Sequence, residues 1–591
     1  MFSIVVGMYM GPAFSSTSVT SLRDLDVLLL DCQTTGASPR RGHLLEVAWC
    51  RTRARQGECA EEADVFATTV ALPEGEKVPR RIKRLTGIGQ ADLERALQPA
   101  EVWRRLMRDA GAVVTSAGST RAPAVSHFAR FERGFFEDLC EQHSQPFPLD
   151  LICTHEIACR VLPGLPRRGL RAMAGYFGHV LDEHKRAEAH VRATAVVWSH
   201  LVDLLQDDWQ ISSLWDLRLF LQEVKAARGG GRQYPMPRER RLALPATPGV
   251  YHMLGKGGEV LYLGKATSLK SRVNSYFQRP RHDNQRTSEW LTQAYDVAVY
   301  PEPTPLEAAL READEIKRLA PPYNVALRQR EDAVWFTCAG LDDERPQADA
   351  RHCLGPVPVR GALSTMTLLR DLLAGARLEA PTEAYHAGLP RELEAALLLA
   401  GVVELRSRRG RWLGDAPLEA GAVLRLGAWL WRRQRREEEE RAGQEPQPEA
   451  DEPAQEREER VWDAGRVAAA LEYSLLRAAQ LLRRAHWLCQ LSEACLAWET
   501  SAGGRRLLEI RGGEVVRADE LDPGAPAPCP EGHARPALER MARFDPVMHD
   551  RLRVLTTELR RLVARQAELE LRLGPDRALD RRALARRLWW F

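Results

Sequence analysis

The stretch that most constrains this chain runs from Pro248 to Phe277 and reads PGVYHMLGKGGEVLYLGKATSLKSRVNSYF. Two short apolar runs, each containing a tyrosine, flank a glycine-rich segment at 255–258. Turn glycines between two runs of β-type residues are typical of a β-hairpin. A segment with amphipathic helical spacing follows and carries Arg272 and Tyr276. The stretch therefore predicts a hairpin and a helix that gather phenols and cations, which can activate water and hold a phosphate.

The rest of the chain is too long for one hydrophobic core. Its 591 residues indicate about three or four domains. A net charge of +3 is nearly balanced, so a DNA-binding surface has to be a local patch. Eleven cysteines without a C-x-x-C pair favour a reducing cytoplasm over a disulfide framework. No apolar run approaches the ~20 residues needed to span a bilayer, so we expect no membrane partner.

The first domain is expected at residues 23–205, after a disordered tail at 1–22. Residues 26–30 (DVLLL) and 43–50 (HLLEVAWC) are apolar runs that predict buried strands, and the first run stops at Asp31. Helical and strand patterns then alternate to the end of the segment. This order predicts an α/β layer fold with a mixed sheet.

Four motifs of this domain resemble those of the DnaQ-like (DEDDh) 3′–5′ exonucleases. They are LLLDCQTTG (28–36), LTGIGQADL (85–93), SHFARFERGFF (126–136) and HKRAEAHVRATA (184–195). The resemblance covers nearly the whole segment and implies an RNase H-like exonuclease fold.

The acidic residues of that family are poorly kept, which gives a degenerate exonuclease site. The resemblance aligns four family carboxylates with Asp31, Gln33, Glu132 and His190. An amide binds divalent metal poorly, and imidazole suits Mg²⁺ badly. Two-metal hydrolysis needs several carboxylates around the two cations. We therefore expect this domain to be inactive as an exonuclease.

The general base of the family aligns with Lys185, and His184 is adjacent and could serve after a shift of one residue. One alternative is a single-metal remnant that uses Asp31 and Glu132. The preferred interpretation is a fold retained for holding a DNA end or strand.

Residues 206–244 are expected to connect two domains. Residues 208–227 have helical apolar spacing, and a glycine-, proline- and arginine-rich linker follows them. Such a linker is flexible, and its arginines fit either a solvated surface or a path along a DNA backbone.

The central domain is expected at 245–330, and its motifs closely resemble the GIY-YIG nuclease domain of UvrC and of its shorter relative Cho. The triplets Gly249-Val250-Tyr251 and Tyr262-Leu263-Gly264 stand at the two defining motifs. Residues 306–325 (LEAALREADEIKRLAPPYNV) resemble the last helix of that domain and its ending. The resemblance implies a small mixed sheet with helices and a metal-dependent endonuclease activity on DNA.

The resemblance also implies a role for each matching residue. Glu312 would be the sole protein ligand of one Mg²⁺ or Mn²⁺ ion, a hard cation that keeps several waters. Arg272 would hold the scissile phosphate, with Lys265 as a second cation. Tyr251 would be the general base, because a metal and two cations favour its phenolate.

The remaining matching residues have supporting roles. The resemblance implies that Tyr262 and Tyr276 orient the attacking water or bind phosphate, and that Asn324 and Gly264 contact the substrate. Taken singly, each residue has a structural alternative: tyrosines at strand ends often pack, and Glu312 could pair with Arg311 or Lys317.

The last 261 positions carry no recognised catalytic constellation. Residues 331–432 are similar to the docking and helical region that follows the nuclease domain in UvrC. Residues 433–460 are rich in Glu, Gln and Pro, which predicts a disordered charged linker. Residues 461–591 predict a C-terminal α+β domain of unknown role, so that the region is largely helical with a small β element.

Together the segments predict a DNA repair-type endonuclease of the nucleotide-excision kind that nicks damaged or structured DNA. A damage-recognition complex is a possible partner, because no helix-hairpin-helix motif is present. One alternative is a non-catalytic, nucleic-acid-binding repair adaptor. The second is a bifunctional 3′–5′ exonuclease and endonuclease.

Overall fold

The computed structural model describes residues 20–55, 64–181, 184–225, 231–278, 284–325, 333–358, 360–374, 395–413, 418–442, 462–500, 503–531 and 535–588. By their contacts the residues divide into two compact units. The first comprises Met1–Thr247, Tyr251–Pro301 and Pro321–Tyr323. The second comprises Pro248–Val250, Glu302–Ala320 and Asn324–Phe591.

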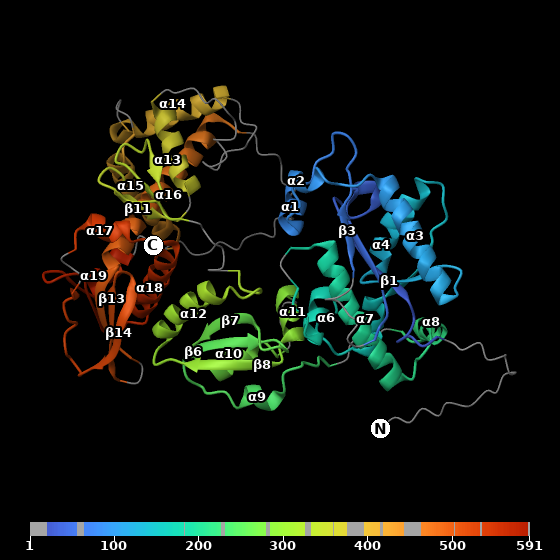
Figure 1. Cartoon of the computed structure of the whole chain (residues 1–591). Helices are drawn as coiled ribbons and strands as arrows, with labels where there is room; N and C mark the ends of the chain where they lie inside the picture. Colours follow the sequence, from blue (N-terminus) through green and yellow to red (C-terminus); the bar gives the residue numbers. More distant parts are fainter. Residues whose placement is uncertain are drawn as a thin grey trace. The chain divides into compact units, whose positions relative to one another are not determined.

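A five-stranded sheet in the order β3-β2-β1-β4-β5 forms the centre of the exonuclease-like part of the first unit (Figure 1). β1 is antiparallel to β2 and parallel to β4, so the predicted mixed α/β sheet is confirmed. The strands are β1 (Val27–Thr34), β2 (Leu44–Thr52), β3 (Phe66–Thr69), β4 (Ala122–Ser126) and β5 (Leu149–Cys153).

The central strand β1 is buried on both faces. Leu28 and Leu30 pack with residues of α3 (Pro99–Ala117) and α4 (Ala129–Glu141), whereas Leu29 packs with residues of α7 (Ala187–Trp209) on the other face. A strand covered on both faces reads as a continuous apolar run, which the sequence shows. The expected end of this strand at Asp31 is wrong, because Asp31, Cys32 and Gln33 continue the pairing with β2 as far as Thr34.

Further helices of this part are α1 (Arg80–Thr86), α2 (Gln90–Leu93), α5 (Thr154–Val161) and α6 (Leu170–Phe177), with the 3-10 turn η1 (Pro39–Arg41).

Two boundaries differ from the sequence expectation. Leu22, which falls in the expected disordered tail, is fully buried, and its amide donates to the carbonyl of Ser212. Residues 1–19 lie outside the described residues. The helix expected at 208–227 is interrupted, because α7 ends where Gln210 adopts a left-handed conformation.

The rest of the connector is ordered where the structure describes it. α8 (Leu214–Glu223) begins anew behind a Ser213 cap, and α9 (Arg238–Leu242) occupies part of the expected linker. Residues 226–230, which include Arg228, lie outside the described residues.

The first unit also contains most of the GIY-YIG-like part, whose sheet has the order β7-β6-β8. The glycine-rich segment joins β6 to β7, and Gly258 adopts the positive φ of 84° that a turn glycine allows. Side chains from both strands pack with Trp290 and with Met236 of the connector. The elements are β6 (Gly249–Leu254), β7 (Val260–Ala266), α10 (Leu269–Ser275), α11 (Gln285–Gln293) and β8 (Asp296–Pro301).

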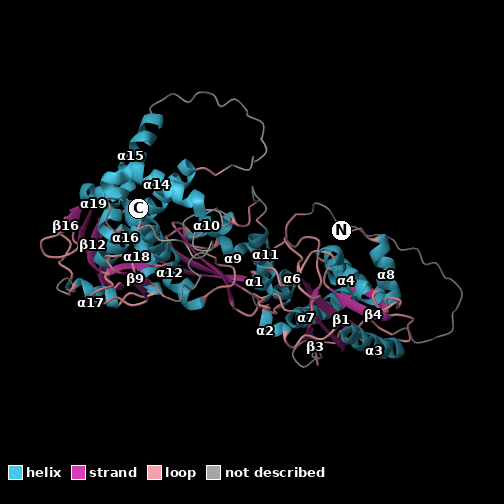
Figure 2. Ribbon diagram, turned by 90° about the horizontal axis from the view of Figure 1, so that it is seen from above, coloured by secondary structure: helices cyan, strands magenta, loops and turns pink. Residues whose placement is uncertain are grey.

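The second unit has a helical part and a five-stranded sheet in the order β14-β13-β12-β15-β16. Figure 2 shows α14, α15 and α16 as the helical part, with β12 and β16 in the sheet. The long helix α16 (Ala464–Leu491) leads directly into β12 (Glu493–Glu499). No helix in the described part of the chain is long and apolar enough to cross a bilayer.

The other helices of the second unit are α12 (Pro305–Leu319), α13 (Arg360–Leu373), α14 (Ala395–Leu413), α15 (Ala420–Ala442), α17 (Ala537–Ala542), α18 (Pro546–Ala564) and α19 (Arg581–Leu588). Its other strands are β9 (Trp335–Thr337), β10 (Glu344–Arg345), β11 (Leu354–Val357), β13 (Arg505–Arg511), β14 (Glu514–Leu521), β15 (Leu569–Arg572) and β16 (Ala578–Asp580). Helix α15 extends ten residues into the expected charged linker, and the rest of that linker, 443–460, lies outside the described residues.

Candidate active site

Three tyrosines meet at one end of the hairpin. Tyr251 comes from β6, Tyr262 from β7 and Tyr276 from the C-terminal end of α10. The phenol oxygens of Tyr251 and Tyr276 are 2.7 Å apart, which is a hydrogen bond. The ring centroids of the three tyrosines are 6.2–6.3 Å from one another. The structure therefore brings together three of the residues that the sequence singled out.

The space around Gly264 explains why the second motif ends in glycine. A Cβ atom at this position would lie 2.4 Å from the phenol oxygen of Tyr251 and 2.7 Å from its ring carbon Cζ. Tyr251 is fully buried and cannot move away without disturbing the core. The glycine thus makes room for the first tyrosine, and this packing role was not part of the sequence prediction.

Arg272 lies next to the phenols on the exposed side of α10. Its guanidinium carbon is 4.9 Å from the ring centroid of Tyr276, within the range of a cation–π contact. Partial burial works to lower the pKa of Arg272, but the neighbouring phenols, Tyr251 first, outweigh it and raise that pKa. The cation is therefore permanent and has an open side from which it can bind a phosphate.

The surroundings of Tyr251 shift its pKa. Burial, followed by the nearby Tyr276 and Tyr262, raises the pKa of Tyr251 well above its usual range. Arg272 acts in the expected direction and lowers it, but this effect is smaller than that of burial. The chain's own groups thus favour the neutral phenol, and the predicted phenolate requires the bound metal ion in addition to the two cations.

Trp290 completes the aromatic cluster and was not predicted as a site residue, because a lone tryptophan on a helix is usually a core residue. Its ring stacks on Tyr262 with centroids 5.2 Å apart and planes 5° from parallel. Its centroid is 5.0 Å from that of Tyr276 at an interplanar angle of 76°. Lys265, the second expected cation, is half-buried at the end of β7.

The expected metal ligand Glu312 lies on α12, in the second unit. Thr304 caps this helix by accepting a hydrogen bond from the amide of Glu307, and Pro305 occupies its first turn. Glu312 is half-buried. Asn324, also of the second unit, is 7% exposed.

The two basic residues near Glu312 in the sequence each pair with acidic residues of the second unit. Arg311 forms ion pairs with Glu302 and Glu315, and Lys317 pairs with Asp550. A single half-buried carboxylate fits a hard divalent cation that keeps most of its waters.

The residues of the degenerate exonuclease site form a different arrangement. The amide nitrogen of Gln33 donates to one carboxylate oxygen of Asp31 at 2.8 Å. Nδ1 of His190 is 3.2 Å from the other oxygen of Asp31. Both oxygens that would bind a cation in the exonuclease family are therefore in contact with side chains of this chain.

Glu132 belongs to the same site and is 3% exposed. Burial, reinforced by the charge of Asp31, raises the pKa of Glu132 to about 9. Within the described residues its Oε2 atom has no hydrogen-bond partner. The described residues contain no group of three or more His, Cys, Asp or Glu side chains placed to hold a metal. The residues present therefore do not fit a two-metal centre.

The alternative base His184 makes its described contact with another residue, Gly87. It is exposed on the stretch before α7, and its ring packs against Gly87, where a Cβ would lie 3.4 Å from Cδ2 of His184. Lys185 is also exposed, and its amide donates to the carbonyl of Leu85.

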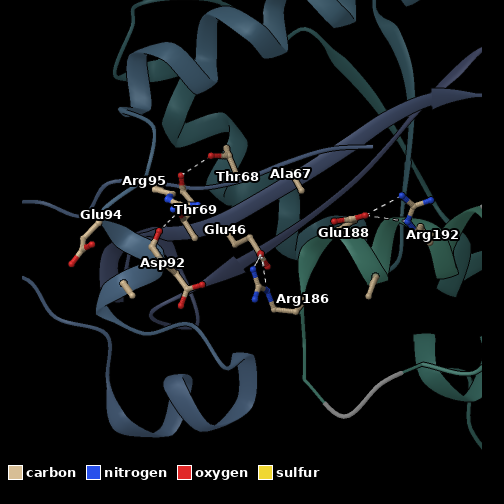
Figure 3. A pocket seen from close by; sticks show the side chains of 12 residues that line it. Glu46, Ala67, Thr68, Thr69, Asp92, Glu94, Arg95, Arg186, Glu188 and Arg192 are labelled. Carbon is tan, nitrogen blue, oxygen red and sulfur yellow. Dashed lines mark hydrogen bonds and ion pairs between the residues drawn. The ribbon is translucent and has the colours of Figure 1, made fainter. Parts of the chain in front are cut away.

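A cleft of about 860 Å³ opens on the exonuclease-like part (Figure 3). Four of its charged groups form two pairs: Arg186 contacts Glu46, and Arg192 contacts Glu188 (Figure 3). Glu46 is 3% exposed, and its other oxygen accepts from the amide of Ala187 at the start of α7. These contacts make Glu46 a structural residue rather than a ligand-binding group.

An exposed aromatic residue was not identified in the sequence. Phe128 is 48% exposed and has a φ angle of 68°, which is uncommon for a bulky side chain. Its ring centroid is 4.3 Å from that of His155, and the two planes are 32° apart. Strained non-glycine residues cluster at functional sites.

Known proteins are similar to the exonuclease-like part and to the GIY-YIG-like part of this chain. A family model described as a UvrC-like GIY-YIG domain matches residues 247–325, and one described as an exonuclease matches residues 28–195. A protein of Mycobacterium tuberculosis described as a bifunctional exonuclease/endonuclease is 26% identical over 426 residues, which cover 70% of this chain and 62% of that protein. UvrABC system protein C of a Psychrobacter species is 37% identical over 139 residues, 22% of each chain. The chain thus spans less than two thirds of the length of these relatives.

Two solved structures have local similarity to the same parts. The magnesium-bound GIY-YIG domain of UvrC from Thermotoga maritima is 33% identical and covers 15% of this chain and 94% of its own, with a TM-score of 0.14. The nuclease domain of 3′hExo, a DEDDh family member, is 14% identical and covers 33% of this chain and 95% of its own, with a TM-score of 0.26.

The folds and the matches define a protein built from two nuclease-type domains. More particularly, the chain carries an exonuclease domain of the RNase H-like, DnaQ-like class, followed by a UvrC-like GIY-YIG endonuclease domain.

Proposed function

We propose that this protein is a metal-dependent DNA endonuclease that makes a single nick through its GIY-YIG domain. The observation that carries the proposal is the Tyr251–Tyr276 hydrogen bond beside the guanidinium of Arg272. Buried phenols and an exposed permanent cation next to each other suit the handling of a proton and a phosphate at one place.

Each residue of the proposed site has a role in this reaction. Arg272 binds the scissile phosphate from the open side of α10, and Lys265 adds positive charge. In its phenolate form Tyr251 accepts the proton of the attacking water, and the hydrogen bond with Tyr276 holds its oxygen in place. Tyr262 orients the water, while Gly264 and Asn324 shape the substrate side of the site.

Glu312 is the proposed ligand of Mg²⁺ or Mn²⁺. Bound there, the ion would supply positive charge to the phosphate oxygens and to the developing leaving group. This assignment rests on the position of Glu312 in the GIY-YIG family match and on the hard, half-buried carboxylate that it offers.

We further propose that the exonuclease domain does not cleave and instead holds a DNA strand. Its Asp31 carboxylate is occupied by Gln33 and His190, which leaves little room for a metal pair. The exposed ring of Phe128, which lies beside the partly buried His155, offers an aromatic surface of the kind on which an unpaired base stacks.

The deciding experiment is a cleavage assay of the full chain on supercoiled plasmid and on nicked, flapped and lesion-bearing duplexes. We expect nicking with Mn²⁺ or Mg²⁺, none with chelator, and a loss of at least about a hundredfold for Arg272→Ala and Glu312→Ala. Glu499→Gln, an exposed carboxylate at the end of β12, is the matched control and should nick as the wild type does. Equal nicking by all of these variants would reject the site, and DNA binding without any cleavage would favour the adaptor function.

A bifunctional exonuclease and endonuclease is the second candidate, because the Mycobacterium tuberculosis relative carries that description. A single-metal remnant on Asp31 and Glu132 would then trim DNA.

The ten cysteines that the structure describes are free thiols, which supports a cytoplasmic location. A damage-recognition complex remains part of the proposal as the partner that selects the nicking position.

A further inference from the structure

Helix α11 connects the aromatic cluster to the exonuclease domain within the first unit. Asn284 caps the helix by accepting from the amides of Arg286 and Thr287. Trp290 and Leu291 belong to the core under the hairpin, whereas Thr292 and Gln293, also buried, face the exonuclease domain. An amphipathic surface helix has one buried stripe, so burial on two sides indicates two partners.

The first partner is the pair of phenols on the nuclease side. The Trp290 ring is parallel to Tyr262 and meets Tyr276 at a steep angle, as described above. Trp290 is 2% exposed, so the DNA substrate does not reach it. A stacked and an edge contact from one rigid ring together restrict the rotation of both phenols.

The second partner is the segment 167–177 of the exonuclease domain. The amide of Arg167 donates to the hydroxyl of Thr292 at 3.0 Å. The hydroxyl of Tyr295, just after α11, donates to the carbonyl of Tyr176 at 2.7 Å. A Cβ on Gly175 of α6 would lie 1.9 Å from Oε1 of Gln293.

Gln293 has little freedom to avoid such a contact. It is 4% exposed, and its amide nitrogen donates to the hydroxyl of Tyr323 at 2.6 Å and to the carbonyl of Glu289 at 3.1 Å. Arg171 of α6 lies over the Tyr323 ring with its guanidinium carbon 4.9 Å from the centroid. The close approach of α6 and α11 therefore depends on the absence of a side chain at Gly175.

We propose that Trp290 is a positioning residue for Tyr262 and Tyr276, and that the exonuclease domain is a brace that holds α11, and with it Trp290, in place. This deepens the proposed endonuclease function and rests on it. The physical reason is that the reaction rate falls steeply when catalytic groups shift by a fraction of an ångström from the productive geometry. The exonuclease domain then contributes to nicking without a metal or a cleavage step of its own.

The test uses the full chain with Mn²⁺ and a plasmid substrate, and measures kcat and KM separately. Trp290→Leu should lower kcat about tenfold or more with KM changed less than about twofold, because in the proposed site the phenols act on the attacking water while Arg272 binds the phosphate. Trp290→Phe keeps an aromatic ring and should restore most of kcat. Trp215→Leu removes a tryptophan that is 72% exposed on α8 and should behave as the wild type.

The brace is tested from the far side of the interface. Gly175→Ala should lower kcat several-fold, although Gly175 belongs to the exonuclease domain. Gly111→Ala makes the same change in α3, where a Cβ would meet nothing within 4 Å, and should leave kcat unchanged. Identical kcat for the two glycine variants, or an unchanged kcat for Trp290→Leu, would overturn the proposal.

Amide hydrogen exchange separates this proposal from the proposed function. In Gly175→Ala, and not in Gly111→Ala, the amides of α11 and of 251–276 should exchange faster than in the wild type, whether or not the protein nicks DNA. If the wild type fails to nick, the endonuclease function is rejected while exchange still reports on the brace. If the wild type nicks and these amides are unaffected by Gly175→Ala, the brace alone is rejected.

Discussion

The phenol oxygens of Tyr251 and Tyr276 are 2.7 Å apart, although the residues come from a buried strand and from the end of a helix. Tyr251 is 1% exposed, whereas Tyr276 is half-buried and lies under Arg272. The hydrogen bond thus links an enclosed phenol to the guanidinium side of the site. The Tyr276 hydroxyl is therefore the immediate hydrogen-bond partner of the oxygen that we propose as the base.

The raised pKa of Tyr251 predicts how nicking depends on pH. The neutral phenol dominates below that pKa, so the fraction of phenolate, and with it the nicking rate, should rise by up to about tenfold per pH unit. We expect single-turnover nicking to keep rising from about pH 6.5 to about pH 9 without a plateau. A plateau near neutrality would show that Tyr251 is not the base, and Tyr251→Phe should remove the slope together with the activity.

Gly264→Ala should inactivate the nuclease without removing any polar group. The added methyl would lie 2.4 Å from the phenol oxygen of Tyr251, so the hydroxyl has to leave its hydrogen bond with Tyr276. We expect kcat to fall at least about a hundredfold, with a loss of stability of about 1–3 kcal/mol from overpacking. Gly231→Ala, where a Cβ meets nothing within 4 Å, is the control. Normal nicking by Gly264→Ala would contradict the assigned position of Tyr251.

The stability of the exonuclease domain should depend on Glu132. Its pKa of about 9 in the folded chain exceeds the ordinary value of 4.5. The fold therefore retains a proton that the unfolded chain releases, so the stabilisation is complete below pH 4.5 and is lost as the pH rises towards 9. Glu132→Gln cannot titrate, and its melting temperature should rise relative to that of the wild type as the pH increases. Glu137→Gln, on the same helix and partly exposed, should show no such trend.

Restoring two carboxylates should restore a metal site. In Gln33→Glu/His190→Asp the amide donor and the imidazole beside Asp31 are replaced by acids, which recreates the four-acid pattern together with Glu132. We expect the variant to bind Mn²⁺ at this site by calorimetry and to trim a labelled 3′ end, whereas the wild type does neither. Trimming by the wild type that is abolished by Asp31→Asn would instead support the bifunctional protein.

Phe128 is predicted to bind single-stranded DNA. Base–aromatic stacking contributes about 1–3 kcal/mol per base, so Phe128→Ala should weaken binding of a single-stranded oligonucleotide by about fivefold or more. The measurement is fluorescence anisotropy at a fixed salt concentration, because phosphate contacts make the affinity salt-dependent. Leu219→Ala removes another exposed apolar side chain of the same unit and should leave the affinity unchanged. Equal affinities of both variants and the wild type would remove Phe128 from the binding surface.

The sequence alone determined the two domain folds and predicted the residues of the candidate site. The residue pattern predicted the hairpin and the buried strand β1, because turn glycines and continuous apolar runs are signals carried by neighbouring residues. Local patterns do not report long-range pairing, and β1 therefore continues beyond Asp31 through its register with β2. For the same reason Leu22 was predicted to lie in a disordered tail, although it is buried in the core.

The tertiary structure alone decided the direction in which the pKa of Tyr251 shifts and the supporting contacts of the site. The pKa of Tyr251 depends on burial and on two other phenols, which are brought to it from β7 and from the end of α10. The roles of Trp290 and Gly175 are visible only in the tertiary structure, where α11 contacts the tyrosines and α6. The sequence specifies which chemical groups are present, but their proton affinities and orientations follow from desolvation and packing among residues distant in the chain.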